Sequence, residues 1–236
     1  MEPGLKADPK RYNLPAIRKA AKITHAAFRD ISKYIVLGIN ERQLAWRMGR
    51  LLQKYGSEKR AFPVIAAFGP SAAEPHHVPT SRRLKDGQMI KIDAGAVYND
   101  MRGDITRTFF FGKPTTKFLN RYNAVLTAQK RSFKYMKAGV SGKKIDSIAR
   151  NYLKKKNYHK LFIHGLGHGV GRAIHQPPSL TPSKRGERVL QVGEVVTNEP
   201  GIYEKGWGGI RIEDMVEITS SEPRWLGDQA ELTVLK

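Results

Sequence analysis

The chain has 236 residues, of which 40% are hydrophobic and none is cysteine. This length is enough to bury a sizeable core, and the lack of cysteine excludes disulfides, zinc–thiolate sites and cysteine nucleophiles. The 42 Lys and Arg residues outnumber the 21 Asp and Glu residues and give a net charge of +21. Such a field attracts polyanions, but the basic residues are spread along the chain, so we expect at most weak, non-specific nucleic-acid binding.

The chain begins with a polar segment and two predicted helices. Residues 1–15 lack the apolar stretch of a signal peptide, and no later run reaches the roughly 20 apolar residues of a membrane span. We therefore expect a cytoplasmic protein without membrane contact, as a monomer or homodimer. Apolar residues at helical spacing predict a helix over residues 14–37, which Gly38 ends. Asn40 is placed to cap a second helix that runs to about Tyr55.

Strands and a histidine-containing loop follow the helices. Apolar residues 62–68 predict a strand, and a loop with His76, His77 and Pro79 comes after it. Residues 89–94 predict another strand, and residues 105–111 predict its partner in a hairpin.

The same order of elements returns in the second half. Helices are predicted over residues 118–137 and from 141 to about 156, followed by a strand that starts at 162–163, a loop with His175, Pro177 and Pro178, a strand at 195–199 and its hairpin partner at 210–218. Gly38 matches Gly139 at an offset of 101 residues, and His76 matches His175 at an offset of 99. We therefore predict an α+β fold in which a duplicated helix–helix–hairpin unit surrounds a curved antiparallel sheet about a pseudo-twofold axis.

Carboxylates occupy equivalent places in the two predicted hairpins: Asp93 matches Glu199, and Asp104 matches Glu213. Asp93 lies in an otherwise apolar strand, where Asp is disfavoured, and we expect it to face Asp104 across the hairpin. Buried carboxylates repel each other unless a proton or a cation lies between them. Four of them, together with one imidazole, suit a pair of divalent metal ions.

His168 is the candidate imidazole. It lies in the glycine-rich segment 164–175, where glycines let the backbone approach a metal and a substrate closely. Five of the seven histidines fall in the two equivalent loop regions, at positions 76, 77, 164, 168 and 175, which favours a functional site over ordinary packing. The segment lacks the Lys-Ser/Thr pair of a phosphate-binding loop, so that alternative is disfavoured.

Three segments resemble the pita-bread metallopeptidases, which include methionine aminopeptidases, Xaa-Pro aminopeptidases and prolidases. They are residues 91–109, 164–178 and 198–214. The resemblance implies the pita-bread fold and two divalent metal ions, with Mn, Co, Zn or Fe as candidates. It also implies that a metal-bridging water is the nucleophile in peptide hydrolysis. The implied metal ligands are Asp93, Asp104, His168, Glu199 and Glu213.

The resemblance also implies roles beyond metal binding. Glu199 would be the general acid/base, and His175 and His76 would be the catalytic histidines beside it. We further expect His164 to line the substrate pocket, Arg211 to orient a ligand carboxylate, and Trp207 to shape the pocket.

The interval of 14 residues between Glu199 and Glu213 resembles the proline-specific branch, as does the Asp93-Ala-Gly motif. We therefore expect removal of the N-terminal residue from Xaa-Pro peptides. Residues 1–236 are expected to form a single catalytic domain without the N-terminal creatinase-like domain of prolidases. Because this layout resembles methionine aminopeptidases, that activity is an alternative. A non-catalytic pita-bread protein that binds RNA or ribosomes is the alternative from another class.

Overall fold

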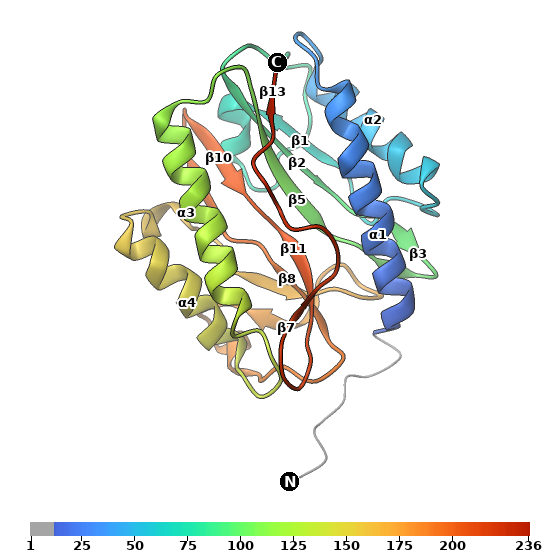
Figure 1. Cartoon of the computed structure of the whole chain (residues 1–236), viewed down its shortest axis with the longest axis vertical. Coiled ribbons are helices and arrows are strands. Elements are labelled where there is room, and N and C mark those ends of the chain that lie inside the picture. Colours follow the sequence, from blue (N-terminus) through green and yellow to red (C-terminus); the bar gives the residue numbers. More distant parts are fainter. Residues whose placement is uncertain (1–11) are drawn as a thin grey trace.

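The computed structural model describes residues 12–236 (Figure 1). In this part of the chain, helices α1 (Leu14–Ile31) and α2 (Glu41–Lys54) lie beside the strands of the first half, and α3 (Thr116–Phe133) and α4 (Gly142–Lys155) lie beside those of the second. Helices α1 and α3 each have 18 residues, and α2 and α4 each have 14. The duplication predicted from the sequence is therefore visible in the helix lengths.

Side-chain caps begin the second helix of each half, as the sequence predicted. The Asn40 side chain accepts a hydrogen bond from the Gln43 backbone N–H, and the Gln43 side chain accepts one from the Asn40 N–H, which completes a capping box. The Ser141 hydroxyl accepts a hydrogen bond from the Lys144 N–H at the start of α4. These caps satisfy backbone donors that have no partner within the helix.

The turns between the paired helices also match. Gly38 has a φ of 81° and Gly139 a φ of 83°, in the left-handed region that favours glycine.

The first helix of each half is shorter than predicted. Helix α1 ends at Ile31 and continues only as the 3-10 turn η1 (Ser32–Tyr34), and α3 ends at Phe133.

Two larger sheets form the centre of the fold. The first has the strand order β1–β2–β5–β13 and consists of β1 (Ile65–Phe68), β2 (Gln88–Ala94), β5 (Ile105–Phe111) and β13 (Val234–Leu235). Only β13 pairs in parallel. The second is antiparallel, with the order β12–β11–β8–β6–β7, and consists of β12 (Arg224–Trp225), β11 (Asp214–Glu217), β8 (Val195–Asn198), β6 (Gly167–Gly169) and β7 (Gln176–Leu180).

Short hairpins and 3-10 turns complete the described elements. The hairpins are β3 (Val97–Tyr98) with β4 (Met101–Arg102), and β9 (Gly201–Glu204) with β10 (Gly208–Arg211). The remaining 3-10 turns are η2 (Gly69–Ala73), η3 (His159–Leu161) and η4 (Lys184–Glu187).

The two larger sheets meet where Thr106 of β5 bridges to Glu213, which immediately precedes β11. The Glu213 N–H donates to the Thr106 carbonyl at 3.1 Å, and the Thr106 hydroxyl donates to the Glu213 carboxylate at 2.6 Å. Hydrophobic clusters lie on both sides of this junction, one built mainly from the first half and a larger one mainly from the second. The junction therefore consists of polar contacts between two hydrophobic cores.

Two predicted strands and one predicted loop differ in the structure. The strand expected from residues 162–163 begins only at Gly167, because residues 159–161 form η3. The expected loop with His175, Pro177 and Pro178 includes strand β7, which starts at residue 176. The expected strand at 210–218 is divided into β10 and β11, because Glu213 leaves the hairpin and pairs with the other half of the molecule.

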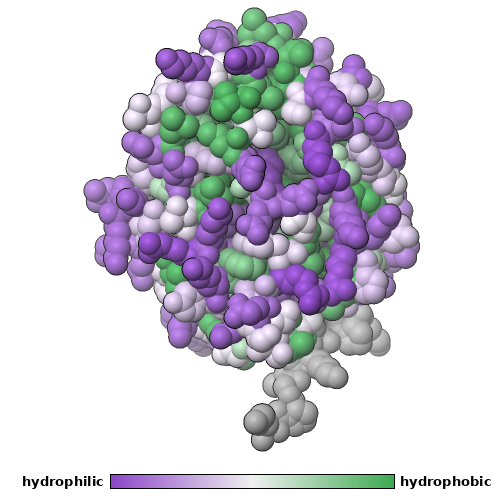
Figure 2. Space-filling model, viewed as in Figure 1, coloured by the Kyte–Doolittle hydropathy of each residue, from purple (hydrophilic) through white to green (hydrophobic). Residues whose placement is uncertain are grey.

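On the face in Figure 2, hydrophilic side chains are scattered among apolar ones and do not gather in one patch. None of the helices in residues 12–236 is long and apolar enough to cross a membrane.

Candidate active site

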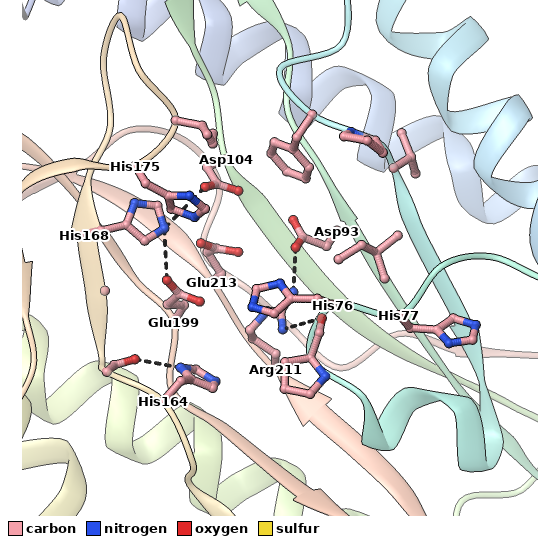
Figure 3. Close-up of a pocket in the computed structure, with 18 of the residues that line it drawn as sticks. His76, His77, Asp93, Asp104, His164, His168, His175, Glu199, Arg211 and Glu213 are labelled. Atoms are coloured by element: carbon pink, nitrogen blue, oxygen red, sulfur yellow. Dashed lines mark hydrogen bonds and ion pairs between the residues drawn. The ribbon is translucent and has the colours of Figure 1, made fainter.

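A cavity of about 570 Å³ opens at the junction of the two sheets (Figure 3). This volume lies within the range of small-molecule sites. All five predicted metal ligands line the cavity: Asp93, Asp104, His168, Glu199 and Glu213. His76, His164, His175 and Arg211 line it as well. The structure therefore brings nine of the ten predicted site residues to one cavity.

The four carboxylates lie at or just beyond strand ends. Asp93 is near the end of β2, and its partner across the hairpin is Thr106 rather than Asp104, which corrects the expected register. The β2–β5 ladder stops at Ala94 and Ile105, so Asp104 lies one residue beyond it. The β8–β11 ladder likewise stops at Asn198, one residue before Glu199. Leaving the ladder frees these residues to turn their carboxylates into the cavity.

The ligand atoms converge. In Figure 3 the carboxylates of Asp104, Glu199 and Glu213 point toward one another and toward the His168 ring. Asp104, His168 and Glu213 each offer one ligand atom, and these atoms lie within 4.8 Å of one another. The His168 Nε2 is 3.2 Å from a Glu199 oxygen and 3.7 Å from an Asp104 oxygen. The His168 Nδ1 donates to the Gly169 carbonyl at 3.2 Å, which leaves Nε2 directed at the carboxylates.

Burial and mutual repulsion disfavour charge on three of the carboxyl groups. The pKa of Asp104 is raised well above its ordinary value by burial and by the neighbouring Glu213 carboxylate. The pKa of Glu213 is likewise raised well above its ordinary value by burial and by Glu199. Burial also raises the pKa of Asp93, although Arg211 opposes this. A bound cation would offset both the burial and the repulsion.

Asp93 gives a second, independent indication that the site fits a cation. Its Oδ2 accepts a hydrogen bond from the Arg211 Nη2 at 2.5 Å. Its Oδ1 is buried and has no hydrogen-bond partner among residues 12–236. A buried carboxylate oxygen without a partner is costly, and oxygen ligands of this kind suit Mn, Fe, Co or Zn ions. The donor set therefore fits a centre that holds divalent metal ions.

Glu199 and His168 differ from the other candidate ligands in the direction of their pKa shifts. Burial acts to raise the pKa of Glu199, but the hydrogen bond and charge of His168 outweigh it and lower this pKa to about 2. Burial acts to lower the pKa of His168, and Glu199 reverses this, so the pKa of His168 is raised. Glu199 is thus the carboxylate in this cluster whose charged form is favoured by its neighbours.

Hydroxyl groups that were not predicted from the sequence hold the candidate ligands in place. The Thr197 hydroxyl accepts from the His168 N–H and donates to a Glu199 oxygen, with both distances 3.1 Å. Thr197 lies two residues before Glu199, so strand alternation could have placed it on the same face. Thr106 accepts from the Arg211 Nε at 3.0 Å and donates to Glu213. No local sequence signal indicates that contact, because it joins the two halves.

Tyr203 is a further missed residue, and it connects Arg211 to His164. The Arg211 Nη1 donates to the Tyr203 hydroxyl at 3.0 Å, and this hydroxyl lies 2.9 Å from the His164 Nε2. The His164 Nδ1 lies 2.7 Å from the Gly165 carbonyl, which can only accept, so Nδ1 carries the proton. The Tyr203 hydroxyl therefore donates to Nε2. Burial lowers the pKa of His164, consistent with a neutral ring, and raises the pKa of Tyr203 to about 12.

The flanking histidines approach from opposite halves. The His175 ring packs edge-on against the His168 ring, with centroids 4.3 Å apart, and burial and His168 lower the pKa of His175. His76 lines the cavity from the loop after η2. Its neighbour His77 also lines the cavity and is bound to Glu41, with the His77 Nε2 2.8 Å from the carboxylate. His77 thus anchors the loop to the start of α2.

A buried lysine supports the His76 loop. Lys91 is completely buried, and its Nζ lies 3.1 Å from the Ala72 carbonyl oxygen and 2.5 Å from that of Glu74. The Arg211 Nη1 donates to the Pro75 carbonyl in the same loop at 3.2 Å. The sequence analysis treated Lys91 only as a strand residue. The side chains of Lys91 and Arg211 therefore hold the backbone just before His76.

Trp207 is not part of the cavity, which corrects the expectation that it shapes the pocket. It lies in the turn between β9 and β10 and packs against the core of the second half. The Arg121 guanidinium lies 4.2 Å from its ring centroid, and the Lys117 Nζ lies 5.3 Å away. Both residues belong to α3, so the hairpin directs the indole toward that helix instead of the cavity.

The fold is a duplicated α+β fold, and carboxylates converge with His168 at the junction of its two larger sheets. This combination is typical of metal-dependent hydrolases. The chain belongs to metallopeptidase family M24, whose sequence profile matches residues 15–220. It is 43% identical over 211 residues to the Xaa-Pro dipeptidase of Pyrococcus furiosus, an alignment that covers 89% of this chain and 60% of the relative. It is 41% identical over 205 residues to the Xaa-Pro dipeptidase of Pyrococcus horikoshii, covering 87% and 58%.

Solved structures confirm the pita-bread fold. An Xaa-Pro dipeptidase from Bacillus anthracis superposes with a TM-score of 0.92 at 36% identity, covering 98% of this chain and 64% of that one. An X-Pro aminopeptidase from Thermotoga maritima gives a TM-score of 0.92 at 34% identity, with the same coverages. The prolidase from Pyrococcus furiosus gives 0.91 at 40% identity, covering 96% and 66%. The chain thus spans about 60% of the length of the curated relatives it matches.

Proposed function

We propose that the chain is a metal-dependent exopeptidase that removes the N-terminal residue from Xaa-Pro peptides. The observation that carries the proposal is the convergence of four carboxylates, three of them buried, and His168 in one cavity, with a buried Asp93 oxygen lacking a partner in the described residues. The similar proteins named Xaa-Pro dipeptidase support the substrate class. On this proposal residues 1–236 act as one catalytic domain, and the peptide is its partner.

The proposed metal ligands are Asp93, Asp104, His168, Glu199 and Glu213. Divalent ions held there would supply the Lewis acidity that polarises a scissile carbonyl and makes water acidic enough to attack it near neutral pH. Glu199 would accept the proton of the attacking water and transfer it to the leaving amine. The position of Glu199 supports this role, because Thr197 and His168 fix both its orientation and its charged state.

Three of the histidines that line the cavity, His76, His164 and His175, would contact the substrate. His175 and His76 would donate hydrogen bonds to the developing negative charge on the peptide carbonyl. His164 is oriented by Gly165 and Tyr203, and it would line the part of the pocket that receives the peptide. Arg211 would hold the Asp93 carboxylate in place and contact no substrate.

The test is a substrate panel on protein loaded separately with Mn, Co, Zn and Fe(II). The panel contains Xaa-Pro dipeptides, Xaa-Pro-Yaa tripeptides and Met-Ala-Ser. We expect turnover of the Xaa-Pro peptides and its loss after treatment with a chelator. Turnover of Met-Ala-Ser alone would contradict the proline assignment and favour a methionine aminopeptidase. Binding of less than one metal ion per chain, with no peptide cleaved, would contradict the enzyme proposal and favour a non-catalytic protein.

A further inference from the structure

The loop that carries His76 has few backbone partners. Within the described residues 12–236, the backbone of residues 75–79 makes no hydrogen bond to another backbone group. Its carbonyl oxygens accept from side chains instead, and the Pro75 oxygen accepts from the Arg211 Nη1 at 3.2 Å. The place of His76 in the cavity therefore depends on the side chains that hold this loop.

Lys91 holds the residues just before His76. Its Nζ donates to three main-chain carbonyl oxygens, which belong to Ala72 at 3.1 Å, Glu74 at 2.5 Å and Pro75 at 3.5 Å. Three acceptors match the three N–H donors of a lysine ammonium group. Lys91 forms no ion pair with any residue in the described part of the chain, so its hydrogen bonds serve this one segment.

The lysine is an unexpected residue for its place in the strand. It is completely buried on β2, and it lies on the same face as Met89 and Asp93, two residues to either side. Met89 packs in the hydrophobic core, so an apolar side chain would suit the neighbouring position. Burying a cation costs free energy unless it is hydrogen-bonded. The strand ladder uses only backbone groups, so the ammonium group stabilises the loop rather than the strand.

His76 is directed at the residues that would act on the substrate. In Figure 3 its ring points toward the carboxylates, whereas the His77 ring points away, toward Glu41. Burial lowers the pKa of both His164 and His175, and the charge of His76 lowers them further, so His76 lies within electrostatic reach of both rings. A shift of the backbone before His76 therefore moves its ring relative to these groups.

We infer that Lys91 is a positioning residue that sets the place of the His76 ring by holding the three carbonyl oxygens before it. The inference rests on the proposed function, in which His76 donates to the developing negative charge on the peptide carbonyl. Lys91 does not line the cavity, and it makes no hydrogen bond or ion pair with a candidate metal ligand in residues 12–236. Its effect is thus separable from that of Arg211, which binds Asp93 as well as Pro75.

The experiment is a double-mutant cycle on metal-loaded protein, with Lys91→Met, His76→Ala and the double variant. Met keeps most of the lysine stem and removes the ammonium group. We expect Lys91→Met to lower kcat for an Xaa-Pro dipeptide about tenfold to a hundredfold with KM changed much less, because a misplaced donor acts on the transition state. In the His76→Ala background the same substitution should change kcat by less than about twofold, because no ring remains to be placed.

Ser57→Ala is the matched control for loss of a buried loop anchor. The Ser57 hydroxyl donates to the Lys59 carbonyl at 2.7 Å and accepts from the Val97 N–H at 2.8 Å, and Ser57 does not line the cavity. We expect this variant to have a lower Tm and the kcat of the wild type. Metal content by elemental analysis should be unchanged in Lys91→Met. If that variant does not fold, Lys91→Gln, which keeps N–H donors on a shorter stem, takes its place with the same expected cycle.

Inhibition by a phosphinate analogue of the same dipeptide gives a second readout, because its tetrahedral anion takes the place of the developing charge. Its Ki should rise in Lys91→Met and in His76→Ala, and no further in the double variant. Additive effects of the two substitutions, an unchanged kcat or loss of metal in Lys91→Met, or an equal loss of kcat in Ser57→Ala would each overturn the inference and leave the proposed function standing. A wild-type protein that cleaves no Xaa-Pro peptide would overturn the proposed function, and the role of Lys91 would fall with it.

Discussion

The two halves of the molecule supply matched carboxylates but stabilise them in different ways. Asp93 of the first half is bound by Arg211, which comes from the second half, and its pKa is still raised by burial. Glu199, the equivalent residue of the second half, is bound by His168 from its own half, and its pKa is lowered to about 2. Duplication thus fixed where the carboxylates lie, whereas their partners determine which one is charged without a metal.

The difference between these carboxylates suits them to two tasks, cation binding and proton transfer, although they occupy equivalent places in the duplicated fold. Asp93, Asp104 and Glu213 resist ionisation, so they gain most from a cation. Glu199 is already ionised beside an imidazole, so it can exchange a proton with little rearrangement. A fully symmetric duplication could not provide both properties, because equivalent residues would share the same environment.

The largest expected effect comes from Glu213, which joins the halves through Thr106. In Glu213→Gln we expect a loss of kcat/KM of about a hundredfold to a thousandfold, the order found when one preorganised electrostatic group is removed, and reduced metal content by elemental analysis. Glu217→Gln is a matched control, because Glu217 lies on the same segment but pairs with Arg18 outside the cavity. Full metal content and activity in Glu213→Gln would contradict the proposed ligand set.

The next effect concerns stability and tests the contact between the halves. Arg211→Met leaves the buried Asp93 carboxylate without its remaining partner. We expect the metal-free variant to lose about 3 kcal/mol of unfolding free energy in urea, because an unpaired buried charge is strongly destabilising. Metal loading should restore part of the loss. Arg18→Met is the control, since Arg18 is partly exposed and its pair should contribute about 1 kcal/mol at most. Equal losses in the two variants would contradict this account of Asp93.

The sequence predicted the helices and the candidate ligands better than the contacts between the two halves of the molecule. Periodicity, caps and paired glycines located the four helices, because these signals depend on neighbours within a few residues. The candidate ligands were predicted because carboxylates in apolar strands need an explanation and their spacing resembled a known family, and the structure places all five at one cavity. Strand pairing across the halves was not predicted, since Thr106 and Glu213 are 107 residues apart. The interruption of the last hairpin and the partners of Tyr203 follow from that contact.

Trp207 shows a different limit. A tryptophan in a loop next to two ligand-bearing strands could face either the cavity or the helix beside it. The direction was decided by Arg121 and Lys117, which lie on α3 more than 80 residues earlier in the chain. Residues that contact the ligands through hydroxyl groups were missed for a similar reason, because a single Thr or Tyr in a strand fits an ordinary sheet equally well.

The smallest expected effect is a pH dependence that separates the two kinds of carboxylate. In the metal-free protein, Asp104 and Glu213 have pKa values raised well above the ordinary range, so the folded state binds more protons than the unfolded state above about pH 4. Their effect is to lower stability as the pH rises toward the raised pKa. His168 acts in the same direction, because its raised pKa gives stability that is lost at higher pH. The contribution of Glu199 is constant above its ordinary range, because its pKa is lowered to about 2.

Bound metal replaces these protons, so metal loading should stabilise the protein more at about pH 8 than at about pH 5.5. We expect the rise in Tm on loading to differ by a few degrees between the two conditions, measured by calorimetry. Taking the difference between loaded and metal-free protein at each pH removes the effect of surface groups, which are the same in both. The Glu213→Gln variant should show a smaller difference, since it lacks one of the carboxyls with a raised pKa. A larger gain at the lower pH would mean that these carboxylates are charged before metal binds, and the contrast between Glu199 and the other three would disappear.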